Sequence, residues 1–282
     1  MQIKLLASNT FHRGPGKVYQ NLAKGLVLSG HQVNQQIIGE HDLTVCLQYI
    51  AGIQSLSSHN TLFGPNLVTL PTELQDLYSD RTKHFLVPSQ WVKDLYSKFA
   101  FVNPDNIHVW SVGIDTDFWK PSENKKPTQD CFIYYKNRSQ NDLNIVQLML
   151  KKLKLSYSIL EYGKYTEEQL KETCDNSRFA ILLTGTESQG IGYMEIMSME
   201  IPCYIFNQST WKHEESELSC PASSVPYFDP ICGTFSDNHV SLDHFSNFVD
   251  DVDKFEPRTY IVQNHSLVGS ATKLANILKV TK

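Results

Sequence analysis

Short apolar stretches of strand type alternate with helix-type stretches along most of this chain, and this alternation restricts the fold more than any other feature. In the first half, strands are predicted at 3–7, 33–38, 43–49, 84–89 and 106–112. In the second half, strands at 131–135, 156–162, 178–184 and 202–206 are separated by helices at 140–154, 166–175 and 189–199. Such alternation predicts an α/β fold with parallel sheets covered by helices on both faces.

The segment 17–30 predicts a helix that packs against the first of these sheets. Val18, Leu22, Leu26 and Leu28 recur near one helical face. Gly30 is suited to end this helix, because glycine readily adopts the left-handed conformation that follows many helices.

A change of composition after residue 120 marks the expected domain boundary. The segment KPSENKKPTQD is rich in proline, lysine and polar residues, as linkers are. A chain of 282 residues is long enough for two cores. We therefore expect Rossmann-like domains at 1–120 and 121–282 with a cleft between them. The last helix is a candidate for return to the N-terminal domain.

The composition excludes several classes of protein. A net charge of −5 provides no general attraction to nucleic acids or anionic membranes. No apolar run approaches the roughly 18 residues that a membrane span needs. The six cysteines and ten histidines show no metal-ligand spacing. We expect a cytoplasmic protein with reduced thiols, located in the host cytoplasm if the source is a virus, and without a metal or other cofactor.

The stretch TGTESQGIGYMEIMSMEIPCYIF at 184–206 contains the main candidates for function. Glu187 and Glu195 are separated by seven residues, and Gly190 and Gly192 lie between them at the start of an otherwise good helix. Glycine in a helix costs roughly 1 kcal/mol relative to alanine, so a local requirement must explain both positions. Either the turn packs its backbone closely, or an anionic ligand approaches the bare backbone.

Helix geometry favours the ligand. The expected sheet-facing residues of this helix are Ile191, Met194, Met197 and Ile201. Side chains lean toward the helix N-terminus, so Glu195 reaches back over Gly192. The N–H groups of a helix start suit a phosphate, and a carboxylate can accept hydrogen bonds from vicinal hydroxyls. These features fit a nucleotide diphosphate sugar.

The same stretch resembles the E-x7-E donor-site motif of GT-B glycosyltransferases, most closely those of family 4. HRGPGKVYQNLAKGLVLSGHQV is similar to the N-terminal glycine loop and first helix of that family. FLVPSQWVKDLYSKF and NIHVWSVGIDTDFWKP resemble the end of its N-terminal domain and the approach to its hinge. The resemblance covers nearly the whole chain, which looks like a short viral or bacterial member.

The resemblance implies a retaining hexosyl- or pentosyltransferase that uses a nucleotide diphosphate sugar and needs no metal. It implies that Glu187 holds the sugar, Glu195 the ribose, and Lys136 with Arg138 the diphosphate. The N-terminal domain would hold the acceptor. The remaining donor-binding candidates are Ser188, Gln189, Gly190, Ile191, Gly192, Gly14, Gly16 and Asn66.

The chain departs from the family pattern in places. Tyr135-Lys136 replaces the usual Gly-Arg after the first C-terminal strand, and Arg138 stands in for a later lysine. No histidine matches the catalytic-site histidine of the N-terminal domain, where Asn66 is the candidate instead. The DTD at 115–117 mimics an Asp-x-Asp metal motif through Asp115 and Asp117, but it belongs to the hinge approach.

Alternatives stay open at each position. Gly14 and Gly16 could form only a turn, Lys136 and Arg138 a solvated strand end, and Glu195 an exposed helix residue. A sugar-nucleotide epimerase or phosphorylase, or a catalytically degenerate binding module, would use the same fold. The sequence leaves open the nucleotide, the sugar, the oligomeric state and the acceptor, which could be a glycan, protein, lipid or modified nucleobase.

Overall fold

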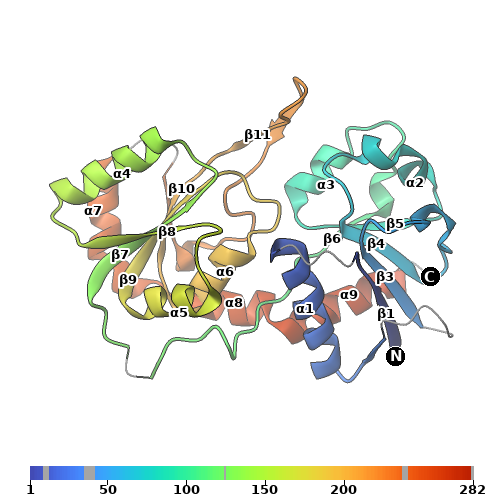
Figure 1. The fold of residues 1–282 in the computed structure, drawn as a ribbon, viewed down its shortest axis with the longest axis horizontal. Helices are drawn as coiled ribbons and strands as arrows, with labels where there is room; N and C mark the ends of the chain where they lie inside the picture. Colours follow the sequence, from blue (N-terminus) through green and yellow to red (C-terminus); the bar gives the residue numbers. More distant parts are fainter. Residues whose placement is uncertain (9–12, 35–41, 124, 237–240, 281–282) are drawn as a thin grey trace. The chain divides into compact units, whose positions relative to one another are not determined.

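The computed structural model describes residues 1–8, 13–34, 42–123, 125–236 and 241–280. The chain divides into two compact units, one of Met1–Gly113 with Asn264–Lys282 and the other of Ile114–Gln263. Each unit contains its own parallel sheet with flanking helices (Figure 1). The division falls before the polar linker because Ile114 and Trp119 are buried in the core of the C-terminal unit.

The sheet of the N-terminal unit has six parallel strands in the order β2-β1-β3-β4-β5-β6. Their bounds are Gln2–Leu6 (β1), Gln32–Asn34 (β2), Leu43–Gln48 (β3), Thr61–Asn66 (β4), His84–Val87 (β5) and Ile107–Val109 (β6). The sequence does not predict β4, because Gly64 and Pro65 interrupt its apolar run and both are uncommon inside strands. The later part of the strand expected at 33–38 lies outside the described residues.

Helix α1 (Arg13–Leu28) begins four residues before its expected start. Pro15 explains the difference, because proline fits the first turn of a helix, where its missing N–H is not needed. Val18, Leu22 and Leu26 are buried as predicted, but Leu28 is 56% exposed, because a residue two positions after Leu26 lies on the opposite side of the helix. Gly30 follows with a φ of 78°, which confirms its role as the helix stop.

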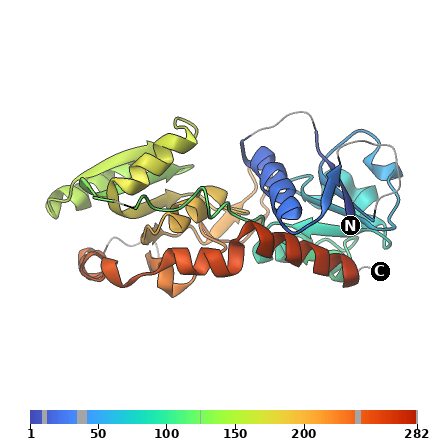
Figure 2. The same ribbon diagram turned by 90° about the horizontal axis from the view of Figure 1, so that it is seen from below.

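The C-terminal helix α9 (Leu267–Val280) belongs to the N-terminal unit and packs against α1 (Figure 2). A Cβ atom at Gly25 would lie 2.5 Å from the carbonyl oxygen of Leu267, and one at Gly113 would lie 2.6 Å from the Leu267 Cα. The Trp110 indole N–H also donates to the carbonyl of Ser270 over 3.0 Å. Two glycines therefore allow the backbone at the start of α9 to pack directly on the rest of the unit. The remaining helices of this unit are α2 (Gln75–Ser79) and α3 (Gln90–Tyr96).

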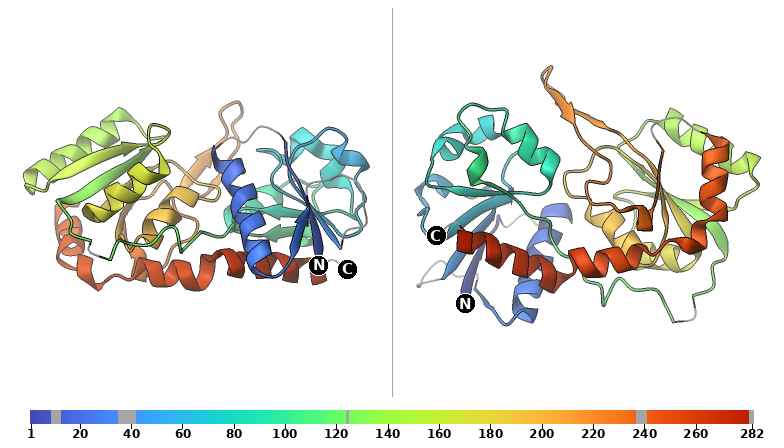
Figure 3. Two further views of the ribbon diagram at one scale, coloured as in Figure 1. Left: turned by 60° about the horizontal axis from the view of Figure 1, so that its bottom comes forward. Right: turned by 180° about the vertical axis from the view of Figure 1, so that it is seen from behind.

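The sheet of the C-terminal unit has five parallel strands in the order β13-β10-β9-β7-β8. Their bounds are Gln129–Lys136 (β7), Tyr157–Glu161 (β8), Ser177–Thr184 (β9), Cys203–Phe206 (β10) and Gly233–Ser236 (β13). The helices are α4 (Gln140–Lys152), α5 (Glu167–Asp175), α6 (Ile191–Ser198), α7 (Leu242–Asp250) and α8 (Pro257–His265), the last of which continues into the other unit. A separate antiparallel hairpin of β11 (Thr210–Lys212) and β12 (Ser219–Pro221) extends away from this sheet (Figure 3).

Successive residues of the central strands point to opposite faces of the sheet and pack into two separate hydrophobic cores. Phe132 and Tyr134 pack with α5, α6 and α8 on one face, whereas Cys131 and Ile133 pack with α4 and α7 on the other (Figure 1). Because both faces are covered, the strands read as continuous apolar runs. The prediction of an α/β fold with two Rossmann-like domains is confirmed.

The structure also bears on the cysteines and on membrane-spanning helices. All six cysteines are buried and free, and burial raises the pKa of the Cys46 thiol to about 12. Among the described residues, no helix combines the length and the apolar sequence that a membrane crossing requires.

The contact between Gly25 and Leu267 predicts that replacing this helical glycine by alanine destabilises the protein, the opposite of the usual effect. Ala normally stabilises a helix interior relative to Gly by about 1 kcal/mol, but we expect Gly25→Ala to lower the free energy of unfolding by about 1–3 kcal/mol, because its methyl group overpacks the contact. Urea unfolding followed by circular dichroism measures the change. Gly14→Ala is the matched control, since a Cβ there meets nothing within 4 Å. Equal stabilisation by both variants would contradict the close contact.

Candidate functional site

The carboxyl edge of the C-terminal sheet brings together two of the predicted residues. Lys136 ends β7, and it is in register with Thr184 at the end of the neighbouring strand β9. The loop after β9 carries Glu187, whose Oε1 lies 2.7 Å from the Lys136 Nζ. The two side chains are 18% and 13% exposed, so the ion pair is partly shielded from water but can be reached.

Neighbouring groups hold this ion pair in place. The Lys136 ammonium lies 4.2 Å from the ring centroid of Tyr162, which follows β8. The Glu187 backbone N–H donates to the carbonyl of Ser223 over 2.9 Å. Burial raises the pKa of the Glu187 carboxyl, and the charge of Lys136 opposes this rise. Glu187 is thus held near a cation in a site that would otherwise disfavour its charge.

Arg138 makes different contacts from those of Lys136. Its Nη1 donates to the backbone carbonyls of Thr184 over 3.3 Å and Phe206 over 3.0 Å. Its Nε lies 3.1 Å from an oxygen of Asp142 in the first turn of α4. Arg138 therefore links the ends of β9 and β10 to the start of α4. The sequence does not indicate this structural role.

The two glycines of the motif allow close packing inside the unit. Gly190 precedes α6 with a φ of 78°, and a Cβ there would overlap the ring of Tyr193. A Cβ at Gly192 would lie 2.5 Å from the hydroxyl oxygen of Tyr134. The Cβ direction of Gly192 therefore faces the Tyr134 hydroxyl. Of the two explanations for these glycines, close packing applies to both positions.

Glu195 lies on α6 and is only 2% exposed, so it is not a solvated helix residue. Burial raises the pKa of Tyr134, and the nearby Tyr165, Glu187 and Glu195 raise it further. The hydroxyl oxygens of Tyr134 and Tyr165 are 3.0 Å apart. The Tyr134 hydroxyl is thus within range of the charges of both glutamates, although a tyrosine within an apolar strand gives no sign of this in the sequence. The helix residues expected to face the sheet do so, since Met194, Met197 and Ile201 are buried and Ile191 packs against them.

Two residues near Glu187 along the chain have buried polar side-chain atoms without a partner in the described part of the structure. Gln189 is 6% exposed, and its Nε2 has no hydrogen-bond partner among the described residues, nor does the Oγ1 of Thr184. Ser188, between Glu187 and Gln189, is exposed. A buried polar atom without a partner costs about 1–3 kcal/mol, so such atoms are rare and require an explanation. A polar ligand at this edge of the sheet would complete their hydrogen bonds.

The base of the β11–β12 hairpin is bonded to the same edge. The Ser224 hydroxyl donates to the Thr184 carbonyl over 3.0 Å and accepts from the Gln208 N–H over 2.9 Å. The Asn207 Oδ1 accepts from the Ser224 N–H over 2.9 Å and from the Ser223 hydroxyl over 3.1 Å. These bonds fix the segment whose Ser223 carbonyl binds the Glu187 N–H. Sequence reasoning missed them because they join loops far apart along the chain.

The other predicted residues lie outside this cluster. Gly14 and Gly16 are in the first turns of α1, and Asn66 ends β4, all in the N-terminal unit. Asp115 accepts a hydrogen bond from the Phe118 N–H over 3.3 Å in a local turn. In the part of the chain that the structure describes, no three histidine, cysteine or acidic side chains are grouped for a metal ion.

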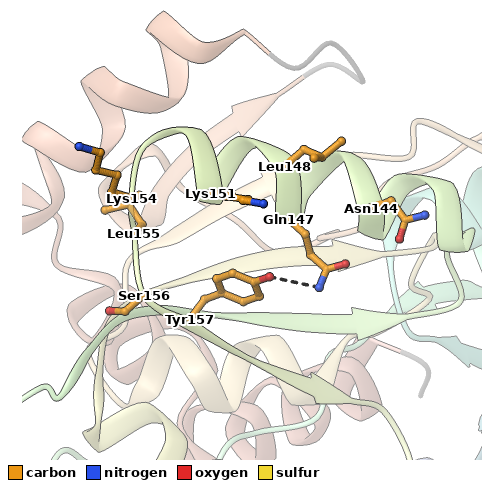
Figure 4. A pocket seen from close by; sticks show the side chains of 8 residues that line it. All are labelled: Asn144, Gln147, Leu148, Lys151, Lys154, Leu155, Ser156 and Tyr157. Atoms are coloured by element: carbon orange, nitrogen blue, oxygen red, sulfur yellow. Dashed lines mark hydrogen bonds between the residues drawn. The ribbon is translucent and has the colours of Figure 1, made fainter.

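A hollow of about 670 Å³ lies between α4 and the start of β8 (Figure 4). Across it, the Gln147 side-chain N–H₂ donates to the Tyr157 hydroxyl over 3.2 Å. Tyr157 is the first residue of β8, so this hollow is at the amino edge of the sheet. Ligands of parallel sheets bind at the carboxyl edge, and none of the predicted residues lines the hollow.

Solved structures with the same fold are glycosyltransferases. A glycosyltransferase from Rickettsia africae is 13% identical with a TM-score of 0.65, covering 99% of this chain and 98% of that one. AviGT4, involved in avilamycin A biosynthesis, is 9% identical with a TM-score of 0.64 (99% and 97% covered). Anabaena Alr3699/HepE in complex with UDP is 11% identical with a TM-score of 0.62 (99% of each chain).

These similarities extend over both units, so the chain has the GT-B fold of two Rossmann-like domains. HepE has also been solved in complex with UDP-glucose. Neither a protein-family model nor a curated protein sequence matches the chain significantly.

The contact between Gly192 and Tyr134 can be tested by a double-mutant cycle. We expect Gly192→Ala to lower the free energy of unfolding by about 1–3 kcal/mol, because its Cβ meets the Tyr134 hydroxyl. Tyr134→Phe removes that oxygen, so the double variant should lose less stability than the sum of the two single variants. Additive losses in urea unfolding would show that the helix does not approach this hydroxyl.

Proposed function

We propose that this chain is a family-4-type glycosyltransferase that moves a hexose or pentose from a nucleotide diphosphate sugar to an acceptor hydroxyl. The Lys136–Glu187 ion pair at the carboxyl edge of the C-terminal sheet carries the proposal. It places a cation and a carboxylate together where ligands of such sheets bind. Glu187 is also the first glutamate of the E-x7-E motif by which the chain resembles that family. The binding of UDP and UDP-glucose by HepE supports the choice of donor.

Lys136 would bind the diphosphate. In the free protein its ammonium is paired with Glu187, and a bound diphosphate would offer it stronger, charge-assisted hydrogen bonds. Negative charge grows on the β-phosphate as the sugar leaves, so a cation already positioned there stabilises the transition state. This contribution requires no divalent metal. Arg138 would act indirectly, since it contacts two backbone carbonyls and Asp142.

The two glutamates would bind opposite ends of the donor. Glu187, in the loop before α6, would accept hydrogen bonds from the sugar hydroxyls once Lys136 turns to the phosphate. Glu195, near Tyr134 and farther along α6, would accept hydrogen bonds from the ribose hydroxyls. The unpaired amide of Gln189 would donate to a sugar oxygen beside Glu187.

The transfer would proceed with retention, as the family resemblance implies. The bond between the anomeric carbon and the phosphate oxygen breaks, and the acceptor oxygen bonds to that carbon on the same face. The acceptor proton passes to the departing phosphate. The chain's own residues therefore need to hold the donor and stabilise charge rather than supply a separate base.

A donor panel tests this function. Purified protein is incubated for long periods with UDP-, GDP-, ADP- and dTDP-sugars, with EDTA or with manganese, and nucleoside diphosphate release is measured. Release in the presence of EDTA supports the proposal. A changed sugar without release would indicate an epimerase, and binding without turnover a non-catalytic module. Release that EDTA abolishes and manganese restores would contradict the metal-independent mechanism.

Lys136 and Arg138 should respond differently to substitution. Lys136→Ala should weaken binding of the nucleoside diphosphate that the panel identifies by roughly tenfold or more, because a hydrogen bond to a charged group contributes about 1.5–3 kcal/mol. Arg138→Ala should mainly lower the melting temperature, because it removes the donor that joins the Thr184 and Phe206 carbonyls. Calorimetry and thermal unfolding measure the two effects. Equal affinity of Lys136→Ala and the parent would remove Lys136 from the donor site.

Glu187 and Glu195 should differ in kinetics. Glu195→Gln should mainly raise KM, because the ribose is bound equally in the ground and transition states. Glu187→Gln should mainly lower kcat, because the sugar gains positive charge as its bond breaks. Affinity for the nucleoside diphosphate alone, which lacks the sugar, should fall only for Glu195→Gln. If both variants bind and turn over donor like the parent, the motif has only a structural role.

A further inference from the structure

The turn after β8 presents a tyrosine beside the end of β7. Strand β8 ends at Glu161, next to the end of its neighbour β7. The Lys164 N–H donates to the Glu161 carbonyl over 3.0 Å and closes a turn with Tyr162 and Gly163 at its centre. Gly163 has a φ of 92°, a left-handed value that glycine adopts without strain in such turns. The turn therefore sets the place of Tyr162.

A second hydrogen bond attaches Tyr162 to β7. Its N–H donates over 2.9 Å to the carbonyl of Tyr135, the residue directly before Lys136. Its ring centroid lies 4.2 Å from the Lys136 ammonium. Tyr162 is 37% exposed, so burial of the ring explains little of its position. The backbone and the ring of Tyr162 thus contact two consecutive residues at the end of β7.

Glu187 and Tyr162 contact the Lys136 ammonium in different ways. The Glu187 carboxylate carries a negative charge and lies 2.7 Å from the ammonium. The ring of Tyr162 is neutral and attracts the cation through the negative face of its π-system. A diphosphate that approaches Lys136 is repelled by the carboxylate but not by the ring. Replacement of Glu187 by a diphosphate therefore leaves the ring contact in place.

Lys136 needs a partner that stays. Its ammonium ends a flexible four-carbon stem, and its side chain is only 18% exposed, where an unpaired charge is costly. We infer that Tyr162 is the positioning residue of Lys136, which holds the ammonium at this edge and retains it when a diphosphate takes the place of Glu187. That replacement rests on the proposed function, but the hold of the ring on the free ammonium does not.

Inorganic pyrophosphate, the part that all nucleotide diphosphate sugars share, is the first probe. It is titrated by calorimetry into the parent chain and its variants. Tyr162→Leu should weaken binding by about three- to fivefold, the effect of one partly exposed cation–π contact. Tyr162→Phe keeps a ring and should bind within about twofold of the parent. The matched control is Tyr157→Leu, which removes a tyrosine from the start of the same strand and should bind like the parent.

A second background shows whether Tyr162 acts through Lys136. In Lys136→Met, which lacks the ammonium, Tyr162→Leu should change the affinity for pyrophosphate and for UDP by less than about twofold. Equal losses of UDP affinity in both backgrounds would mean that Tyr162 touches the ligand itself, and would overturn the inference. So would a Tyr162→Phe variant as weak as Tyr162→Leu, because the hydroxyl and not the ring would then be responsible.

Amine labelling of the free protein separates this inference from the proposed function. Acetic anhydride should modify Lys136 about threefold faster in Tyr162→Leu than in the parent or Tyr162→Phe. Mass spectrometry measures the rate against that of the exposed Lys254. Faster labelling in a protein whose parent binds neither pyrophosphate nor UDP would refute the proposed function and support the inference.

The opposite result is equally clear. If the parent binds pyrophosphate or UDP and Tyr162→Leu binds it equally well, the proposed function stands and the inference fails, whatever the labelling rate. Unchanged labelling of Lys136 in Tyr162→Leu overturns the inference in either case.

Discussion

Every strand of a parallel sheet ends at the same edge, and this constraint places the functional candidates of both units. In the C-terminal unit it brings Lys136, at the end of β7, to the loop of Glu187 after β9. In the N-terminal unit it aligns Gln48 with Asn66. Both edges contain buried polar atoms that have no partner among the residues the structure describes, and such atoms lower the stability of the free protein. Such local conflicts with stability are typical of functional sites.

Much of the architecture was predictable because both faces of each sheet are buried. Strands such as β7 and β9 then become apolar runs, which stand out between amphipathic helices. β4 was not predictable in this way, because Gly64 and Pro65 fall inside it. The start of α1 was also missed, because two glycines and a proline resemble a loop until the helix they begin is known. In such segments tertiary packing determines the secondary structure more than the intrinsic propensities of the residues do.

Only those parts of the candidate site that belong to one local sequence motif or strand could be predicted from the sequence. Glu187 and Glu195 share one local motif, and Lys136 ends a recognisable strand. The contacts of Tyr134 with Tyr165 and with the helix at Gly192 join distant segments, so no local pattern could reveal them. The glycines illustrate the ambiguity best. A missing side chain indicates that something comes close, but it does not tell whether that neighbour is a ligand or a tyrosine.

The membership of α9 in the N-terminal unit affects how the protein can fold during synthesis. Domains generally fold in order from the N-terminus as the ribosome releases them. Here Gly25 and Gly113 receive Leu267 only after the entire C-terminal unit has been made. While Ile114–Gln263 is being synthesised, the surface of the N-terminal unit that packs against α9 therefore stays uncovered. The N-terminal unit is thus the first to be synthesised in part and the last whose chain is complete.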